Sequence, residues 1–399
     1  MLADLIAANR KQHDQALARM VSASAARVPA FAARLAAAGL DPAAVRGSGD
    51  VSRLPVFTKD QLLAAQRAAP PLGGAVAPDA ALRKLFCSPG PLYEPQLAGP
   101  DPWRWAEALR ATGIGPSDRV LNCFSYHFSP AGAMLEEGCL AVGATVIPAG
   151  VGNHDLQVQV AADVAATAYV GLPSYLKTLV DKAAERGLPW TIRRALVTAE
   201  PLPDFLRSLL EAAVPVVLQA YGTAEAGLLG FETAPRSGLR VPDEVFVEVC
   251  DLDSGAPRFD DGIGQVVVTL FEPALPLVRF GTGDLSAWTI GHDQSLRLAG
   301  VLGRLGEAVK VRGLFLHPRQ AAAALGRIAG LVGFRFVVSR VEHQDALRCE
   351  IVSETGADQA ALATTVRDQI RAALRLTADV VCVATLPAGS SIVDERDWK

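Results

Sequence analysis

Residues 118–150 read DRVLNCFSYHFSPAGAMLEEGCLAVGATVIPAG, and their pattern decides the fold class. Residues 118–126 and 144–150 are short and apolar, which is typical of buried strands, and residues 131–143 are long enough for a helix. A strand followed by a helix and a further strand is a βα unit, and repeated units of this kind build a parallel sheet. The stretch therefore predicts an α/β protein.

The same alternation continues on both sides of this stretch. We expect helices at 101–113, 131–143, 154–166, 174–187 and 203–213, and strands at 118–126, 144–150, 167–173, 193–201 and 214–222. Residues 1–40 are expected to be helical, and Thr58 is a suitable N-cap for a helix over 59–66. Beyond residue 231, strands at 245–251, 264–271 and 277–288 are separated by turns rich in glycine and aspartate, which predicts an antiparallel, β-barrel-like region.

A second domain is expected after the glycines at positions 300 and 303. Strands are predicted at 310–318, 334–341, 347–354 and 379–387, and helices at 319–330 and 358–375. The expected organisation is a large N-terminal domain over 1–302 and a small, mobile α+β domain over 303–399. Because ligand sites form preferentially at domain interfaces, we expect the site in the cleft between the two.

Composition limits the classes of partner. Half of the 399 residues are hydrophobic and 20% are charged, which suits a well-filled core. The net charge of -4 disfavours nucleic acid or an anionic membrane as partner. The six cysteines occur singly, so we expect reduced thiols in a cytoplasmic protein rather than a zinc site or disulfides. Asp4, Arg10 and Lys11 interrupt the apolar pattern at the N-terminus, which predicts a surface helix and neither a signal peptide nor a membrane span.

The segment LQAYGTAEAG follows a predicted strand, so Tyr221, Gly222 and Glu225 are expected at the carboxyl end of the parallel sheet. Ligands bind at this edge in open α/β sheets. A tyrosine can stack on a flat ring, a glycine lets the backbone approach a ligand, and a carboxylate can hold a divalent cation. An ordinary exit from the strand is the alternative for this segment taken alone.

Two further segments place charged residues after predicted strands. In VRFGTGDLSAW, Asp284 is expected in a glycine-flanked turn, where its carboxylate could accept hydrogen bonds from both hydroxyls of a ribose or from its own backbone. In GRLGEAVKVRGLFLHP, Arg304 lies at the domain boundary, with Lys310, Arg312 and Gly313 just beyond it.

Taken in this order, these segments resemble the adenylate-forming superfamily, and within it the phenylacetate–CoA ligase family. Members of that family carry a YG-x-[ST]-E motif, an R-x-GD motif and a GR-x-DD…K-x-RG motif at comparable separations. The segments LPVFTKDQL, YVGLPSYLKTL and LVTAEPLPDFLR are similar to the family in the same order, so the resemblance covers nearly the whole chain. It implies ATP or AMP, Mg²⁺ and CoA as cofactors.

The resemblance also implies roles for individual residues. The catalytic residues would be Glu225, which would hold Mg²⁺, and Arg304, which would reach the ribose or phosphate. The nucleotide-binding residues would be Ser88, Gly90, Glu200, Pro201, Tyr221, Gly222, Thr223, Asp284, Arg304 and Lys310, with Tyr221 stacked on the adenine and Asp284 on the ribose hydroxyls. Tyr126, His127 and Phe128 would line the acyl pocket; for His127, an ordinary surface or core histidine is an equal alternative.

The phosphate loop departs from the family pattern. The family loop reads S-S-G-T-T-G-K-P, whereas residues 88–95 read SPGPLYEP, with agreement only at Ser88, Gly90 and Pro95. Pro91 and Leu92 replace hydroxyl residues, and Glu94 replaces the lysine. Two unit charges about 4 Å apart at an effective dielectric constant of about 20 interact by roughly 4 kcal/mol, so an inward Glu94 would repel a triphosphate. The alternative is that Glu94 points into solvent.

Three further positions depart from the pattern. Ala224 replaces the hydroxyl residue before the glutamate, although Thr223 lies one position earlier. Gly306, followed by Glu307, replaces the acidic hinge residue, and a glycine still permits rotation of the small domain. Ile392 replaces the C-terminal catalytic lysine, which leaves Lys399 as the remaining candidate.

Two functions are therefore open. The first is ATP-dependent activation of a small aromatic or apolar carboxylic acid as its adenylate, with transfer to CoA. The second is a diverged protein of this fold that binds AMP, CoA or an acyl thioester without ATP-driven ligation. The resemblance also makes a homodimer plausible.

Overall fold

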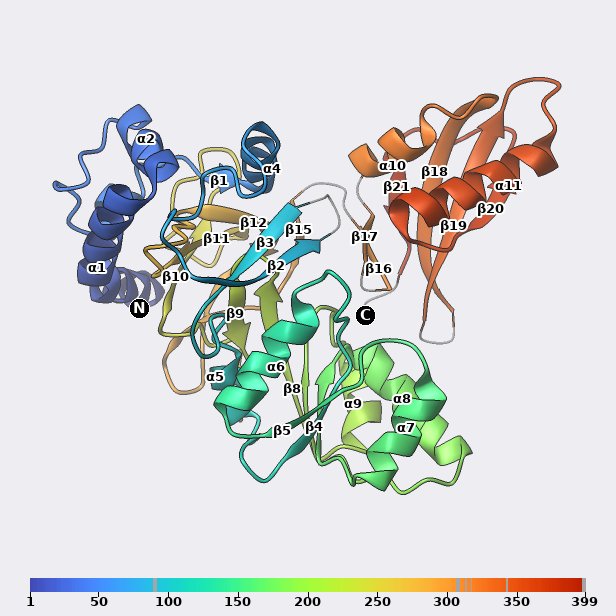
Figure 1. Cartoon of the computed structure of the whole chain (residues 1–399), viewed down its shortest axis with the longest axis horizontal. Helices are drawn as coiled ribbons and strands as arrows, with labels where there is room; N and C mark the ends of the chain where they lie inside the picture. The colour runs from blue at the N-terminus through green and yellow to red at the C-terminus, as the bar shows by residue number, and fades with distance from the viewer. Residues whose placement is uncertain (89–91, 306–308, 313, 317, 342–343, 397–399) are drawn as a thin grey trace. The chain divides into compact units, whose positions relative to one another are not determined.

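The computed structural model describes residues 1–88, 92–305, 309–312, 314–316, 318–341 and 344–396. The chain divides into two compact units, Met1–Gly303 and Arg304–Lys399 (Figure 1). Each unit has hydrophobic clusters of its own. The mobility expected of the second unit stays a prediction.

A six-stranded sheet organises the middle of the first unit, in the order β5-β4-β6-β7-β8-β9. Its strands are β4 (Arg119–Asn122), β5 (Thr145–Pro148), β6 (Ala168–Gly171), β7 (Arg194–Val197), β8 (Val216–Thr223) and β9 (Gly227–Phe231). The helices are α5 (Trp105–Ala111), α6 (Ala131–Ala141), α7 (His154–Asp163), α8 (Pro173–Glu185) and α9 (Asp204–Glu211). All neighbours pair in parallel except β8 and β9, which are antiparallel. The predicted α/β alternation is confirmed.

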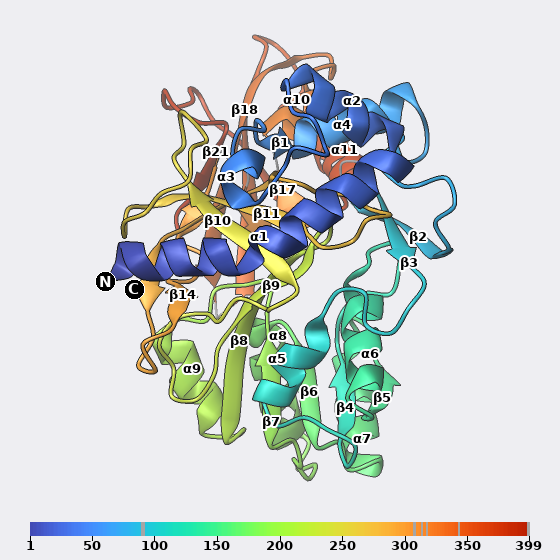
Figure 2. The same cartoon turned by 90° about the vertical axis from the view of Figure 1, so that its left-hand side faces the viewer.

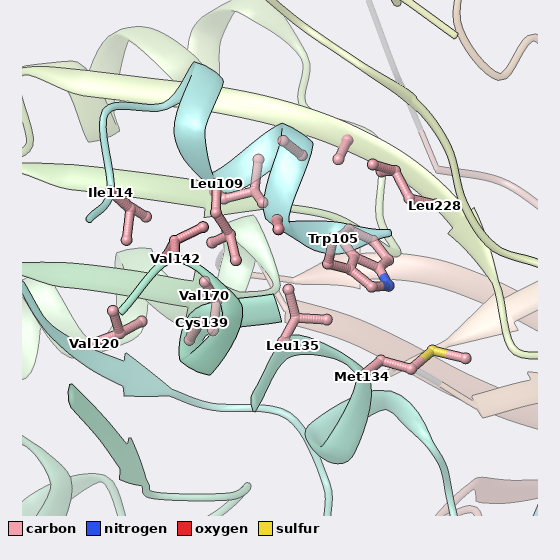
Figure 3. Close-up of a cluster of buried hydrophobic side chains, with 14 of the residues drawn as sticks. Trp105, Leu109, Ile114, Val120, Met134, Leu135, Cys139, Val142, Val170 and Leu228 are labelled. Atoms are coloured by element: carbon pink, nitrogen blue, oxygen red, sulfur yellow. The ribbon is translucent and has the colours of Figure 1, made fainter. Parts of the chain in front are cut away.

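Helices cover both faces of this sheet, and alternate strand residues contribute to the two cores. Val120 of β4 belongs to a cluster that includes residues of α5 and α6 (Figure 3). The next residue, Leu121, belongs to a second cluster that includes residues of α7, α8 and α9. Because both faces are buried, the central strand residues are mostly apolar, as the sequence indicated.

The rest of the first unit combines N-terminal helices with a sheet whose three long strands are antiparallel and whose short first strand is parallel to its neighbour. The elements are α1 (Leu2–Arg27), α2 (Pro29–Ala37), α3 (Ser48–Val51), β1 (Phe57–Thr58), α4 (Lys59–Ala68), β10 (Val245–Cys250), β11 (Gly264–Leu270) and β12 (Phe280–Ser286). The strands follow the open order β1-β12-β11-β10. No closed barrel is formed by the described strands. Asp284 lies inside β12 and not in a turn, because Gly281 and Gly283 are themselves strand residues.

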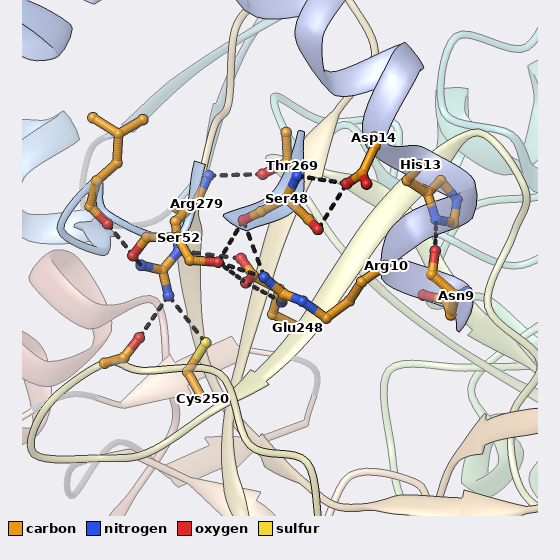
Figure 4. Close-up of polar contacts among 12 residues, drawn as sticks. Asn9, Arg10, His13, Asp14, Ser48, Ser52, Glu248, Cys250, Thr269 and Arg279 are labelled. Atoms are coloured by element: carbon orange, nitrogen blue, oxygen red, sulfur yellow. Dashed lines mark hydrogen bonds and ion pairs between the residues drawn. The ribbon is translucent and has the colours of Figure 1, made fainter. Parts of the chain in front are cut away.

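A buried ion network attaches α1 to this sheet (Figures 2 and 4). Arg10 of α1 lies 2.8 Å from one carboxylate oxygen of Glu248 on β10, and Arg279 lies 3.1 Å from the other. Arg279 also donates to the carbonyls of Ser52 and Leu54, each at 2.7 Å. The network therefore fixes the segment before β1, which leads directly into α4.

Two hairpins complete the first unit: β2 (Leu82–Ser88) with β3 (Leu92–Leu97), and β13 (Trp288–Ile290) with β14 (Leu296–Leu298). The family resemblance predicts a phosphate loop at the first of them. In the structure Ser88 and residues 92–95 are paired strand residues, with Ser88 opposite Leu92 and Phe86 opposite Glu94. Gly90 and Pro91 lie outside the described residues.

The second unit is a small α+β fold. Its elements are β16 (Val309–Val311), β17 (Leu314–Leu316), α10 (Pro318–Leu325), β18 (Leu331–Val341), β19 (Gln344–Ser353), α11 (Gln359–Gln369), a π-helical turn (Ile370–Leu374), β20 (Asp379–Cys382) and β21 (Ile392–Asp394); β15 (Gly303–Arg304) spans the boundary. Four strands form a sheet in the order β20-β19-β18-β21. Ile392 is buried in β21, where a lysine would lose its hydration. Gly306, Glu307, Gly313 and Lys399 lie outside the described residues.

Candidate active site

Tyr221 and Asp284, from two different sheets, are joined by a hydrogen bond. The hydroxyl of Tyr221 on β8 donates to Oδ2 of Asp284 on β12 at 2.8 Å, and it lies 3.2 Å from Oγ1 of Thr282. Asp284 is 2% exposed and Tyr221 is buried. The two residues expected at the adenine and the ribose are therefore brought together, and each limits the orientation of the other.

The segment that follows β7 lies beside them. Ala199 has a positive φ of 72°, and the carboxylate of Glu200 accepts a hydrogen bond from Oγ of Ser174 at 2.6 Å. Gln219, two residues before Tyr221, donates its side-chain amide to the carbonyl of Glu200 at 3.2 Å. Pro201 is exposed. The loop over 199–201 is thus attached to the strand that presents Tyr221.

Gly222 is required by packing. A Cβ atom at this position would lie 2.6 Å from the carbonyl oxygen of Gly227 and 2.9 Å from Cζ2 of Trp105. The next residue, Thr223, accepts a hydrogen bond at its hydroxyl from the backbone N–H of Ala226 at 3.1 Å. Together these contacts shape the tight turn between β8 and β9 that carries Glu225.

Glu225 forms a close ion pair with Lys59. The Lys59 nitrogen lies 2.5 Å from Oε1 of the buried Glu225 carboxylate. The ammonium is thus the close partner of this oxygen, for which the described residues supply no other hydrogen bond. Burial raises the pKa of Glu225, but the Lys59 ammonium and nearby hydrogen bonds outweigh it, so the pKa is lowered overall.

The local sequence explains why Lys59 is placed here. Thr58 and Gln61 form a reciprocal capping box, which starts α4 at Lys59. The backbone nitrogen of Gln61 lies 3.2 Å from the Thr58 hydroxyl oxygen, and the backbone nitrogen of Thr58 lies 2.9 Å from Oε1 of Gln61. The sequence predicts this cap, but none of the motifs it carries assigns a role to Lys59. One sequence feature could have pointed to Lys59: it is the first residue of a helix that directly follows strand β1.

Glu94 points into the protein and not into solvent. The residue is 4% exposed, and its Oε1 accepts a hydrogen bond from the Ser88 hydroxyl at 2.5 Å. Its Oε2 is buried without a hydrogen-bond partner among the described residues. Burial, reinforced by the charge of Glu225, raises the pKa of Glu94 to about 8. The solvent-facing alternative is wrong because Leu92, Glu94 and Gln96 alternate onto the buried face of the hairpin.

Side-chain contacts on both sides of Glu94 fix the hairpin. Gln66 of α4 forms two hydrogen bonds with the backbone of Tyr93, at 2.7 and 2.9 Å. Gln96 donates to Oε1 of Glu137 on α6 at 2.7 Å. Since α4 also carries Lys59, the cation and Glu94 are positioned by the same helix.

Comparisons with known proteins find chains that are similar over most of this length. The family model described as AMP-binding enzyme matches residues 103–269. The chain is 29% identical over 354 residues to a phenylacetate-coenzyme A ligase of Thermus thermophilus, covering 84% of this chain and 78% of that protein. The corresponding protein of Escherichia coli is 25% identical over 382 residues, covering 89% and 86%. A solved 2-hydroxyisobutyryl-CoA ligase in complex with 2-HIB-AMP and CoA has 22% identity and a TM-score of 0.88, covering 97% of this chain and 91% of that one.

Residues 103–269 thus match the AMP-binding enzyme family, and over most of its length the chain is similar to phenylacetate-coenzyme A ligases.

The segment expected to line the acyl pocket lies beside the hairpin. The carbonyl of Phe128 accepts a hydrogen bond from the N–H of Cys87 at 2.9 Å. Tyr126 is half-buried, and its hydroxyl accepts a hydrogen bond from Asn122 at 2.8 Å; burial, together with Glu136, raises its pKa. Phe128 is 67% exposed, and His127 is exposed as well. The role of His127 at an acyl pocket therefore stays a prediction.

The remaining predicted residues belong to the second unit or fall outside the description. Arg304 lies in β15, and Lys310 lies in β16, where its side chain is outside the described part. Within the described part, no three His, Cys, Asp or Glu side chains gather as a metal-binding group. None of the described helices has the length and apolar character needed to cross a membrane.

The residues around Glu225 suit a divalent cation. Mg²⁺ prefers oxygen ligands and is usually held by one or two carboxylates together with substrate phosphates and water, so a larger cluster is not required. Glu94 has a buried oxygen without a hydrogen-bond partner among the described residues, whereas Oε1 of Glu225 has the Lys59 ammonium beside it. Lys59 competes for Glu225, so a bound cation would have to displace or share this contact.

Proposed function

We propose that this phenylacetate–CoA ligase-like protein activates a small carboxylic acid with ATP and transfers the acyl group to CoA. The observation that supports it best is the buried bond between Tyr221 and Asp284, which places an aromatic ring and a carboxylate at one end of the parallel sheet. An aromatic ring and a carboxylate are the groups that recognise an adenine and the two hydroxyls of a ribose.

The reaction has two steps. First, a carboxylate oxygen of the acid attacks the α-phosphorus of ATP; a new P–O bond forms, the bond to the β-phosphate oxygen breaks and pyrophosphate leaves. Then the CoA sulfur attacks the acyl carbon, the thiol proton passes to solvent, and AMP leaves with the electrons of the acyl–oxygen bond. Asp284 would hold the ribose, Tyr221 the adenine, and Arg304 would stabilise the phosphate charge. When bound at Glu225, Mg²⁺ would neutralise charge on the phosphates.

The acid is proposed to be small and aromatic or apolar. Phe128 lies beside the hairpin and exposes a large apolar ring that a substrate could cover. The named relatives are ligases of phenylacetate and 2-hydroxyisobutyrate, which are both small acids.

The test is pyrophosphate exchange with a panel of small aryl and alkyl acids, followed by mass spectrometry of the products after adding CoA. We expect acid-dependent exchange and an acyl-CoA of the matching mass. Asp284→Ala should abolish both, whereas Asp260→Ala, on an exposed loop, should change neither. Binding of AMP or CoA without any exchange would instead support the second candidate.

That second candidate, a nucleotide or thioester binder without ligation, is favoured by one specific set of observations. Glu94 occupies the place of the family's loop lysine and faces inward, and Ile392 at the place of the C-terminal lysine is buried. Calorimetry with ATP plus Mg²⁺, AMP and CoA separates the two, because only the ligase requires ATP binding. A cytoplasmic location and a homodimer stay predictions, the latter checked by light scattering.

A further inference from the structure

The inward carboxylate of Glu94 raises the question of what satisfies it. One oxygen is bonded to Ser88, and the other is buried with no hydrogen-bond partner among the described residues. A buried polar atom left unpaired costs about 1–3 kcal/mol, and more when the group is charged. Buried carboxylates are therefore usually paired with a cation or coordinate a metal.

The charged groups around Glu94 carry more negative than positive charge. Leu92, two residues before Glu94, and Ala226, next to Glu225, belong to one buried hydrophobic cluster, which brings the two glutamates to the same part of the first unit. Lys59 pairs with Glu225 at 2.5 Å. Two carboxylates and one ammonium leave a net charge of -1 when all are ionised. A divalent cation held between the two carboxylates would neutralise both, since their charges sum to -2.

The donor atoms around this point are hard oxygens. Besides the two carboxylates, the hydroxyl of Ser88 lies 2.5 Å from Glu94, and the Thr223 hydroxyl lies in the turn that carries Glu225. Lys59 is the competing cation, and its side chain is 48% exposed. A long, half-exposed lysine side chain can turn toward solvent or toward a bound phosphate when a metal takes its place.

We propose that Glu94 and Glu225 together form the divalent-cation site of this protein, so that the hairpin supplies a metal ligand where the related loop supplies a lysine. The inference rests on the proposed function, in which Glu225 alone holds Mg²⁺; the new ligand is Glu94. A metal between the two carboxylates removes the repulsion that Glu94 would otherwise exert on a triphosphate. The bound metal ion would then supply the positive charge that the loop lysine supplies in the related proteins.

The test measures the metal alone. Mn²⁺ is titrated into the full-length protein without nucleotide and followed by electron paramagnetic resonance, with competition by Mg²⁺. Variants are Glu94→Gln, Glu225→Gln and, as matched control, Glu137→Gln, which also removes a carboxylate that touches the hairpin. Thermal unfolding confirms that each variant is folded.

We expect one Mn²⁺ site in the wild type that Mg²⁺ displaces, and a Kd weakened roughly tenfold or more by either site variant, since even outer-shell losses cost 10–100-fold. Glu137→Gln should bind as the wild type does, and Lys59→Gln should bind more tightly because the competing ammonium is gone. The proposal is overturned if Glu94→Gln binds Mn²⁺ like the wild type, or if the wild type binds none at millimolar concentration. Failure of acid activation would leave these results unchanged, so the two proposals fail separately.

Discussion

The ammonium nitrogen of Lys59 lies 2.5 Å from Oε1 of Glu225, so the carboxylate expected to hold a cation is paired with one from the chain itself. The lysine side chain is half-exposed, whereas Glu225 is buried. Removing the lysine would leave the buried charge of Glu225 uncompensated, and a bound metal ion would compensate it instead. Metal binding and the Lys59 contact are therefore thermodynamically linked.

Lys59→Gln is expected to destabilise the metal-free protein by about 1–3 kcal/mol, between the small effect of exposed pairs and the 3–5 kcal/mol of fully buried ones. Millimolar Mg²⁺ should recover more stability in this variant than in the wild type. Urea unfolding with and without Mg²⁺ measures both. Lys177→Gln, which removes a lysine paired with the exposed Asp181, is the control and should show no Mg²⁺-dependent recovery. Equal recovery in all three proteins would contradict the linkage.

Glu94 should make stability depend on pH in the metal-free protein. Its pKa is raised from 4.5 to about 8 by burial and by Glu225. Between these values the unfolded chain is ionised and the folded one protonated, so unfolding releases a proton. The stabilising contribution of Glu94 is therefore complete below pH 4.5 and lost as pH rises through about 8, with a slope of at most about 1.4 kcal/mol per pH unit.

Glu94→Gln removes this slope while keeping the size of the side chain. Urea unfolding from pH 5 to 8 in EDTA should show the variant gaining stability relative to the wild type as pH rises. Glu137→Gln, which also contacts the hairpin, should follow the wild-type profile. Profiles for Glu94→Gln and wild type that run parallel across this range would show that Glu94 ionises normally.

The sequence predicted the βα units, the change to antiparallel strands and the cap at Thr58, because these depend on local pattern and on side chains close in sequence. It could not predict that Tyr221 bonds Asp284, since that contact joins strands 63 residues apart. It placed Asp284 in a turn because glycines usually mark turns, although here they occur within β12. The sequence also left open whether Glu94 faces inward or outward. Its direction depends on how the hairpin packs against a helix, and composition does not reveal that packing.

Substituting Gly222 tests whether the turn that carries Glu225 depends on close packing. Gly222→Ala would bring a methyl group within 2.6 Å of a backbone carbonyl and 2.9 Å of Trp105. We expect a loss of about 1–3 kcal/mol, as for other overpacked core positions, and weaker binding of divalent cation because Glu225 moves. Gly49→Ala, where no atom lies within 4 Å of the added carbon, is the matched control and should be tolerated. Normal stability and Mn²⁺ binding in Gly222→Ala would show that the turn can adapt.

Two substitutions separate the role of the Tyr221 hydroxyl from the role of the Asp284 carboxylate. Tyr221→Phe keeps the ring and removes the hydroxyl, so it should lower stability by about 1–3 kcal/mol, as expected for a hydrogen bond to a buried carboxylate, and weaken AMP binding only a few-fold. Asp284→Asn keeps the size and removes the charge that would accept both ribose hydroxyls, so AMP binding should weaken by roughly 100-fold. Calorimetry with AMP and with free adenine distinguishes them, because adenine lacks the ribose and should bind Asp284→Asn as it binds the wild type. An equal loss of AMP affinity in both variants would mean that Asp284 acts only by holding Tyr221, and the assignment of the ribose to Asp284 would then be wrong.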